Sequence, residues 1–570
     1  MQTVRKKSQI DKIAVPPRGE RDAFYKEAFF YLAVFFATVA LFFTVKPLYG
    51  LDVQPFKRGS VTVSGAAADL FTVSALVLTA VVAFVLHKNN RLDVGRIVFL
   101  FIVAGTIIRI GYMLKTPAAT RQYDTFSSNF NGHESYAATI YRTGKLPGDN
   151  GYQFYHPPLN AFVQAFFMRV NARLVAVFCP AEVADASYYI PYLAGKPDYV
   201  GAEEYFLYET CQILSVLYSV VVMVTSVKIV SLFGLCGKKK VFATAIIAFF
   251  PRSYQFSALL NNDALALCLS VLALYFALKW YKFGRRWDNI MLCSLCLGLG
   301  MMTKISAATI ALPVAAIFLY ELISSVKKES RAADIKTIVF QYAVFLAVCA
   351  PLGLWFQFYA KSRFGQPFGY VFPYLNKALS TADVPLFERL FITFDKNEWF
   401  GSLFISNFKN YSTGVNNNYN LFNYSVRSAV FGEFGFWNGE VFAIIALFAA
   451  FALAAFSFIG LVYALALFIK KDMRDESEQG KKTKLTVAFL AILAVAEIGS
   501  LVFFYIKMPY SCTMDFRYIM PLIIYLALSA TLTVTRIENE SAFGAVAARA
   551  ITVSEIAFLT LSAVFYILCV

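Results

Sequence analysis

Long apolar segments separated by short polar ones set the pattern of this 570-residue chain. Many of the apolar runs are about 18–20 residues long, the length a helix needs to cross a bilayer. Within a run such as 444–469 the apolar residues do not alternate with polar ones, which argues against the strands of a membrane β-barrel. With 58% hydrophobic and 15% charged residues, the chain is predicted to be an all-α polytopic membrane protein.

The runs predict about 13 transmembrane helices, with the N-terminus inside and the C-terminus outside. Their expected positions are 28–45, 70–86, 97–114, 205–233, 241–258, 264–281, 289–302, 305–323, 337–356, 441–469, 485–506, 518–535 and 550–570. Residues 1–27 are interpreted as a cytoplasmic basic tail rather than a cleavable signal, because no small-residue cleavage site follows the first run. Residues 28–570 are then one membrane domain.

The net charge of +16 follows the predicted topology rather than a nucleic-acid surface. Lysine and arginine cluster in short loops between spans, as is typical of cytoplasmic loops. These loops are 86–96, 237–240, 282–287, 327–336 and 470–484. With them inside, the two long segments 115–204 and 357–440 are predicted to lie outside.

Three further placements follow from the same topology. If the amphipathic stretch 159–178 crossed the membrane, every later loop would lie on the opposite side and the basic loops would be outside. We therefore expect this stretch to lie in the outer interface. The run 289–323 would span about 50 Å as a single helix and is predicted to be a hairpin with Lys304 at its outer tip. A second outer turn within 241–281 carries Arg252 and the Asn-Asn-Asp sequence 261–263.

The polar segment 121–160 is the most unusual feature of the sequence. It follows directly on the apolar run 97–114, is far longer than a connection requires, and contains Asp124, Glu134 and His156. The last of these precedes two prolines, which favour a rigid turn. We therefore expect the chemistry of the protein here.

More charged residues are predicted at the outer ends of apolar runs, where a charge is costly. They are Glu209, Arg252, Asp263, Lys304, Glu433 and Arg517. A carboxylate can accept the proton of an attacking hydroxyl, and lysine or arginine can stabilise a departing phosphate. One base and an in-line attack suffice for transfer of a sugar from a lipid phosphate, with inversion at the anomeric carbon.

Six short motifs occur in order between residues 97 and 535: YDT (123–125), FYHPPL (154–159), NND (261–263), TKIS (303–306), FGE (431–433) and DFRYIMP (515–521). As a set they resemble the GT-C superfamily of polytopic glycosyltransferases, most closely its protein-mannosyltransferase and aminoarabinose-transferase branch. The resemblance implies a polyprenyl-phosphate sugar donor, an outward-facing active site and Asp124 as the acidic-loop carboxylate. The acceptor hydroxyl could belong to a protein, a lipid or a wall glycan.

The sequence departs from the mannosyltransferase pattern at Thr125, where a second acid would follow the first. The sequence therefore leaves open whether Glu134 or Glu209 is the second catalytic carboxylate. The expected substrate-binding residues are His156, Arg252, Asp263, Lys304, Glu433 and Arg517. A divalent cation is possible but not required by any spacing, and the nine scattered cysteines predict no metal site.

Structural interpretations compete at several of these positions. Asp263 after two asparagines also suits a helix N-cap. Lys304 and Arg517 could extend to the outer headgroups. Glu209 could simply begin its span, and Arg109, deep in the third span, predicts a buried partner.

The main alternative function is a polytopic transporter or flippase of lipid or sugar. Such proteins usually show internal repeats and ionisable or broken-helix features near the midplane. Here no repeat is evident, and the charged residues gather at the outer ends beside two large outer segments. A polymerase or ligase acting on lipid-linked glycans is a third possibility, which the YDT and FYHPPL motifs disfavour. The basic loops fit a bacterial plasma membrane.

Overall fold

The computed structural model describes residues 18–51, 63–118, 132–178, 202–327, 332–372, 379–391, 419–432, 478–538 and 542–568, with a few positions between 452 and 462. These residues are almost entirely helical. Within the described ranges there is no β-strand, and one isolated bridge joins Ser380 to Tyr510. The predicted all-α class is therefore confirmed.

The N-terminal half contains eleven α-helices and two short 3-10 helices among its described residues. They are α1 (Arg18–Val45), η1 (Lys46–Leu51), α2 (Val63–Lys88), α3 (Val94–Lys115), α4 (His133–Thr143), η2 (Tyr152–Tyr155), α5 (Leu159–Phe178), α6 (Ala202–Glu209), α7 (Gln212–Leu232), α8 (Gly237–Phe249), α9 (Pro251–Phe256), α10 (Asp263–Lys282) and α11 (Trp287–Thr303).

The remaining described elements follow the turn at Lys304. They are η5 (Ile305–Ile310), α12 (Ala311–Lys327), α13 (Ala332–Phe364), α14 (Leu386–Leu390), α17 (Leu421–Phe431), α19 (Glu478–Lys507), η9 (Ser511–Met514), η10 (Phe516–Ile519), α20 (Leu522–Glu538) and α21 (Ala542–Leu568). The predicted hairpin within 289–323 is confirmed as α11, η5 and α12.

Ten helices of the described part are long and apolar enough to cross a membrane, or eleven if the bent pair of 511–519 and 522–538 is one span. Nine of them match predicted spans, and the bent pair matches 518–535. The predicted spans 241–258 and 289–302 form shorter helices, and most of 441–469 lies outside the described residues. The one candidate helix without a predicted span is α5. It is long and apolar enough to cross the membrane, so its expected interfacial position stays a prediction.

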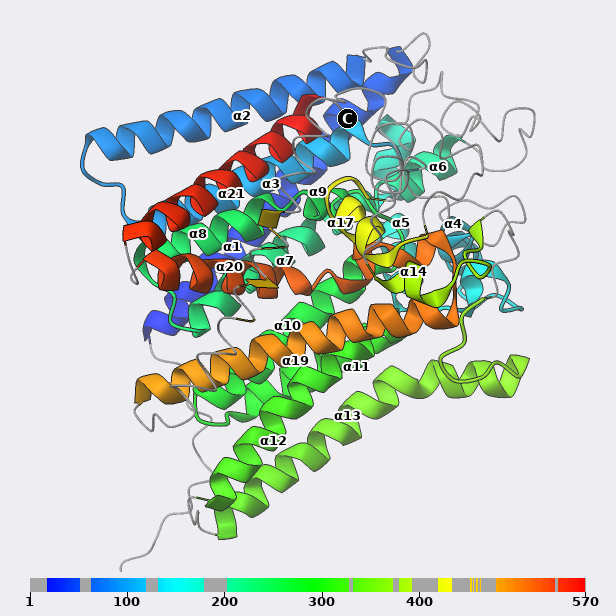
Figure 1. The fold of residues 1–570 in the computed structure, drawn as a ribbon. Coiled ribbons are helices and arrows are strands. Elements are labelled where there is room, and N and C mark those ends of the chain that lie inside the picture. The colour runs from blue at the N-terminus through cyan, green and yellow to red at the C-terminus, as the bar shows by residue number, and fades with distance from the viewer. Residues whose placement is uncertain are drawn as a thin grey trace, which may run out of the picture.

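The long helices run side by side as a bundle (Figure 1). The α2–α3 turn, the facing ends of α12 and α13, and the start of α19 lie towards its left-hand end in this view. The short helices α4, α6 and α14 lie towards the opposite end. The expected outer segments 115–204 and 357–440 thus contribute helices to the same end of the bundle.

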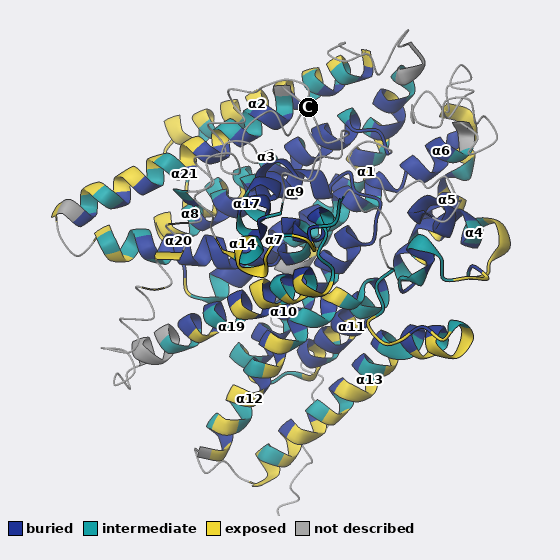
Figure 2. Ribbon diagram, turned by 45° about the vertical axis from the view of Figure 1, so that its right-hand side comes forward, coloured by how far each residue is buried: buried dark blue, intermediate teal, exposed yellow. Residues whose placement is uncertain are grey.

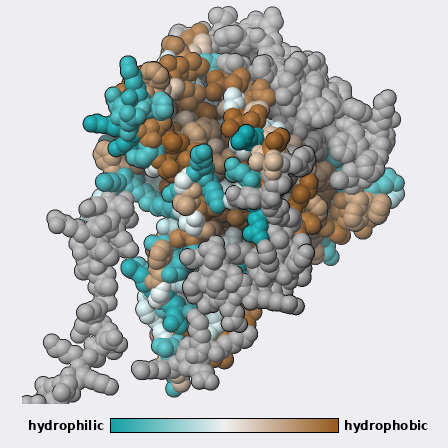
Figure 3. All heavy atoms as spheres, turned by 60° about the vertical axis from the view of Figure 1, so that its left-hand side comes forward, coloured by the Kyte–Doolittle hydropathy of each residue, from teal (hydrophilic) through white to brown (hydrophobic). Residues whose placement is uncertain are grey.

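Burial follows position in the bundle (Figure 2). The core lies along α3, α7, α8, α10 and α20, whose apolar side chains form one buried cluster. In contrast, α2 and α13 expose large apolar side chains such as Leu70, Phe84 and Phe340. Figure 3 likewise shows apolar side chains reaching the surface over much of the described part of one face. An apolar exterior around an apolar core is what lipid as solvent requires.

Two helices break near the same end of the core. Pro251 separates α8 from α9, and η10 meets α20 at an angle of 63°. A break frees backbone carbonyls that need donors inside a membrane. Arg109 of α3 meets this need, because its Nη1 donates to the carbonyl of Ala248 at 2.9 Å and its Nε to Ser219 Oγ at 2.9 Å. The buried partner predicted for Arg109 is thus the backbone at the break.

Candidate active site

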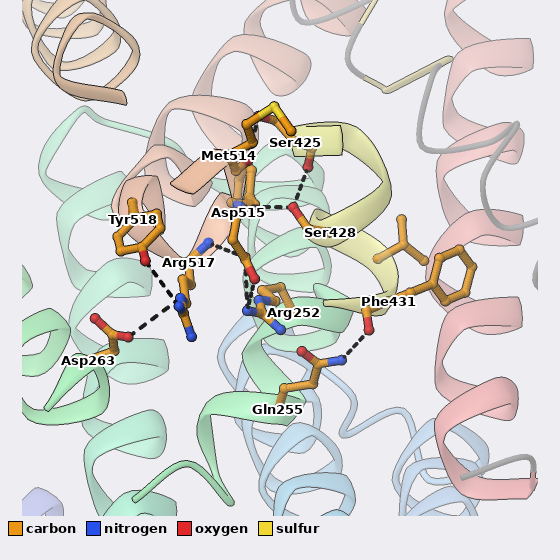
Figure 4. A network of polar contacts seen from close by, with 12 residues as sticks. Arg252, Gln255, Asp263, Ser425, Ser428, Phe431, Met514, Asp515, Arg517 and Tyr518 are labelled. Carbon is orange, nitrogen blue, oxygen red and sulfur yellow. Dashed lines mark hydrogen bonds and ion pairs between the residues drawn. The ribbon is translucent and has the colours of Figure 1, made fainter. Parts of the chain in front are cut away.

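The breaks bring Arg252 and Asp515 together in a buried ion pair (Figure 4). Arg252 lies in the first turn of α9, and its Nη2 donates to both carboxylate oxygens of Asp515, at 2.9 and 2.8 Å. Asp515 is fully buried, and its Oδ1 also accepts the backbone N–H of Arg517, at 2.8 Å. One carboxylate therefore holds α9 and the start of η10 in register.

Helix α17 supports this segment from the other side. Ser425 Oγ donates to the carbonyl of Met514 at 3.0 Å, and the backbone N–H of Phe516 donates to Ser428 Oγ at 2.9 Å. Figure 4 shows these contacts converging on the chain around Asp515. The DFRYIMP motif is thus fixed at both flanks of its aspartate.

Gly432 of the FGE motif closes the end of α17 against Arg252. Its φ of +69° lies in the left-handed region, and a Cβ built there would meet Arg252 Nη1 at 2.1 Å and Gln255 Oε1 at 2.2 Å. Gln255 Nε2 in turn donates to the carbonyl of Phe431 at 2.7 Å. Only glycine satisfies both the conformation and the space at this position.

A second charged cluster joins α10, the α11–η5 turn and η10. Lys304 forms an ion pair with Asp263, and Arg517 Nε lies 3.8 Å from the other oxygen of the same carboxylate. Both cations lie against Tyr518, with Lys304 Nζ 4.9 Å and the Arg517 guanidinium carbon 5.0 Å from the ring centroid. Two cations thus share one carboxylate and one aromatic ring.

The competing interpretations of these residues are resolved by burial. Lys304 and Arg517 side chains are only 12% and 11% exposed, so they do not extend to headgroups. Asp263 is the first residue of α10 and pairs with Lys304 rather than capping the helix through its side chain. The capping contact comes from Asn261, whose Oδ1 accepts the backbone N–H of Asp263 at 3.1 Å.

The polar segment forms a wall next to this cluster. Helix α4 begins at His133, and the imidazole rings of His133 and His156 lie parallel, with centroids 5.8 Å apart. Together with Tyr136, Asn160, Gln164 and Asn262 they line a small cavity. Asn262 directly precedes Asp263, so the cavity adjoins the cation cluster.

Glu134 is buried in the first turn of α4. Burial raises the pKa of its carboxyl to about 7, and the nearby Glu204 acts in the same direction. The hydrogen bond from Ser135 Oγ, 2.9 Å from Oε2, and the charge of Arg142 partly oppose the rise. A carboxyl with a pKa near neutrality can exchange protons at physiological pH.

Glu209 has a different environment. It is fully buried at the end of α6, where Oε1 lies 2.8 Å from Lys46 Nζ and accepts the backbone N–H of Ala118 at 3.1 Å. Lys46 also donates to the carbonyl of Thr116 at 3.0 Å. Glu209 thus binds the backbone at Ala118, six residues ahead of Asp124 in the sequence.

Asp124 and Glu433 lie outside the described residues. The structure brings together Arg252, Asp263, Lys304 and Arg517, and places His156 and Glu134 on the adjoining wall. Sequence reasoning missed Asp515, Tyr518 and Lys46. Asp515 and Tyr518 lie within the DFRYIMP motif, which was the available signal, whereas Lys46 directly follows an ordinary predicted span. In the described part of the chain no three His, Cys, Asp or Glu side chains converge as a metal site.

Residues 208–355 match the family model of dolichyl-phosphate-mannose-protein mannosyltransferases. This match supports membrane glycosyltransferase activity of the GT-C type. The matched stretch runs from the end of α6 to α13 and contains Glu209, Arg252, Asp263 and Lys304. No curated protein matches the chain.

Proposed function

We propose that this glycosyltransferase moves a sugar from a polyprenyl-phosphate donor to an acceptor hydroxyl on the extracytoplasmic side of a bacterial plasma membrane. The cluster around Asp263 carries the proposal. Lys304 and Arg517 come from separate elements and meet over one carboxylate and one tyrosine ring. With Arg252 and Asp515 nearby, three cations are present against two carboxylates, which favours an anionic ligand such as a phosphate.

The reaction requires one displacement. The acceptor oxygen attacks the anomeric carbon while its proton passes to the carboxylate of Asp124, the proposed base. The bond from that carbon to the phosphate oxygen breaks, and polyprenyl phosphate leaves with its charge stabilised by Lys304 and Arg517. Attack opposite the leaving group inverts the anomeric centre.

The remaining residues have supporting roles in this proposal. Glu134 is the second carboxylate, because its raised pKa suits proton exchange near pH 7. Arg252 orients Arg517 through Asp515, and Glu433 follows the glycine that packs on Arg252. His156 contacts the sugar from the adjoining wall. Glu209 holds the backbone at Ala118, ahead of the segment that contains Asp124.

The test is sugar transfer by the purified protein in liposomes, using radiolabelled polyprenyl-phosphate sugars and membrane acceptors. We expect Asp124→Asn to reduce transfer by roughly 10²–10⁴-fold, the usual contribution of a positioned base. Asp149→Asn, an exposed acid of the same outer segment, is the control and should leave transfer unchanged.

Two results would contradict the proposal in different ways. Full activity of Asp124→Asn would keep the reaction and overturn the choice of base. Movement of lipid between leaflets without transfer of any sugar would favour a flippase instead.

A further inference from the structure

The cavity beside the cation cluster is small and lined by polar side chains. Its walls are Tyr136, Asn160, Gln164 and Asn262, with the two histidines, Pro157 and Ala161. All four named side chains belong to buried residues. The cavity measures about 10 Å³, on the order of the space that one water molecule or one hydroxyl group occupies.

The three amide side chains of the cavity are held in one orientation. Gln164 Nε2 and Asn160 Nδ2 both donate to the carbonyl of Leu260, at 2.6 and 3.3 Å. Asn262 Nδ2 donates to the carbonyl of Thr303, at 3.2 Å. Because each nitrogen is committed to a carbonyl, each amide oxygen is left as an acceptor.

Within the described residues these three oxygens receive no hydrogen bond. They are also not among the fully buried polar atoms that lack a partner. Each oxygen is therefore left as an acceptor on a residue that lines the cavity. A set of neutral acceptors without a carboxylate suits a neutral donor group rather than a cation. An O–H group meets this need, because it can donate to an amide oxygen and accept from an imidazole.

The chain places this cavity next to the proposed phosphate site. Asn262 directly precedes Asp263, and its carbonyl partner Thr303 directly precedes Lys304. A sugar linked to a phosphate on Lys304 and Arg517 would therefore extend towards the cavity. The ring of Tyr136 is fixed in the cavity wall, because its hydroxyl donates to the carbonyl of His156 at 3.1 Å.

We infer that this cavity binds one projecting hydroxyl of the transferred sugar and so selects the donor. The inference rests on the proposed function and adds the substrate class. The hydroxymethyl group of a hexose projects furthest from the ring, so the cavity favours a hexose over a 6-deoxyhexose or a pentose. A 6-deoxyhexose or a pentose is disfavoured because it would leave a buried amide oxygen without a hydrogen bond.

The experiment compares three donors that share one polyprenyl phosphate and carry a hexose, its 6-deoxy form or the matching pentose. For the wild type we expect kcat/KM to be at least about tenfold higher with the hexose. Gln164→Leu should bring the ratio of hexose to 6-deoxyhexose close to one, mainly by loss of hexose transfer. Asn171→Leu is the control, because Asn171 is buried on the same helix but donates within it, to the carbonyl of Phe167.

Each outcome is decisive. Equal or better transfer of the 6-deoxyhexose or the pentose by the wild type overturns the inference and leaves the proposed function intact. That comparison needs no variant, so a failure of Gln164→Leu to fold does not affect it. Absence of transfer from every donor overturns the function and the inference together.

Discussion

At the residue scale, three buried ion pairs hold charged side chains at the candidate site and beside it. Arg252 pairs with Asp515, Lys304 with Asp263 and Glu209 with Lys46. A charge within an apolar run is costly, so the sequence marks such residues as important. It does not show the pairing, because the first of these pairs joins residues 263 positions apart.

Gly432 gives a prediction at this scale. Gly432→Ala should displace Arg252 and lower both transfer and thermal stability, because the new Cβ would lie 2.1 Å from Arg252 Nη1. Gly144→Ala is a matched control, since Gly144 has the same φ of +69° but no atom within 4 Å of a built Cβ. We expect the control to lose about 1 kcal/mol from backbone strain alone.

Thermal unfolding and transfer assays of the two variants test this prediction. Transfer should fall only in Gly432→Ala, because only that substitution reaches the ion pair. Equal effects of both substitutions would show that the conformation alone matters at Gly432.

At the element scale, buried ion pairs connect the ends of helices that are distant in sequence. Lys46 begins η1 and pairs with Glu209 at the end of α6. The same lysine donates to Thr116, just after α3, and to Gln212 Oε1 at 3.1 Å, at the start of α7. Four elements therefore meet at one fully buried cation.

Removal of this cation should be strongly destabilising. We expect Lys46→Met to cost about 3–5 kcal/mol, because it leaves the Glu209 carboxylate buried and unpaired. Lys46→Met with Glu209→Gln should recover much of that loss, since glutamine is neutral and keeps an oxygen for the Ala118 N–H. Unfolding of Lys46→Met, Glu209→Gln and the double variant in detergent measures the coupling. A Lys46→Met variant as stable as the wild type would contradict the prediction.

At the scale of the whole molecule, topology decides on which side of the membrane the site works. Among the described elements, the α2–α3 turn, the facing ends of α12 and α13 and the start of α19 lie at the end of the bundle opposite the short helices α4, α6 and α14 (Figure 1), as the charge pattern predicts. The orientation of the bundle in the cell is still a prediction, and so is the interfacial position of α5.

Native cysteines test this orientation. Cys236 is exposed at the start of α8, beside three lysines, and is expected in the cytoplasm. A membrane-impermeant maleimide should label it in inverted vesicles but not in intact cells. The Cys236→Ser variant shows how much of the label is on Cys236. If intact cells label the wild type and this substitution removes the label, Cys236 lies outside and the predicted topology is inverted.

The sequence alone determined the class of the protein and most of its spans, and it indicated the region of the candidate site. Span length, loop charge and the hairpin at Lys304 are local properties, so they can be obtained from a window of residues. The order of the six motifs was also available, and two of them, NND and TKIS, lie within the family match over 208–355.

Only the tertiary structure decided which of these residues act together. For Asp263, Lys304 and Arg517 the sequence left substrate binding open beside a helix cap or headgroup contacts. It offered no role for Asp515 or Lys46. Their ion pairs follow from two helix breaks and from the packing of elements far apart in the chain. Such contacts depend on how the helices pack against one another. The hydrophobic periodicity of one segment does not show which residues of other segments it will contact.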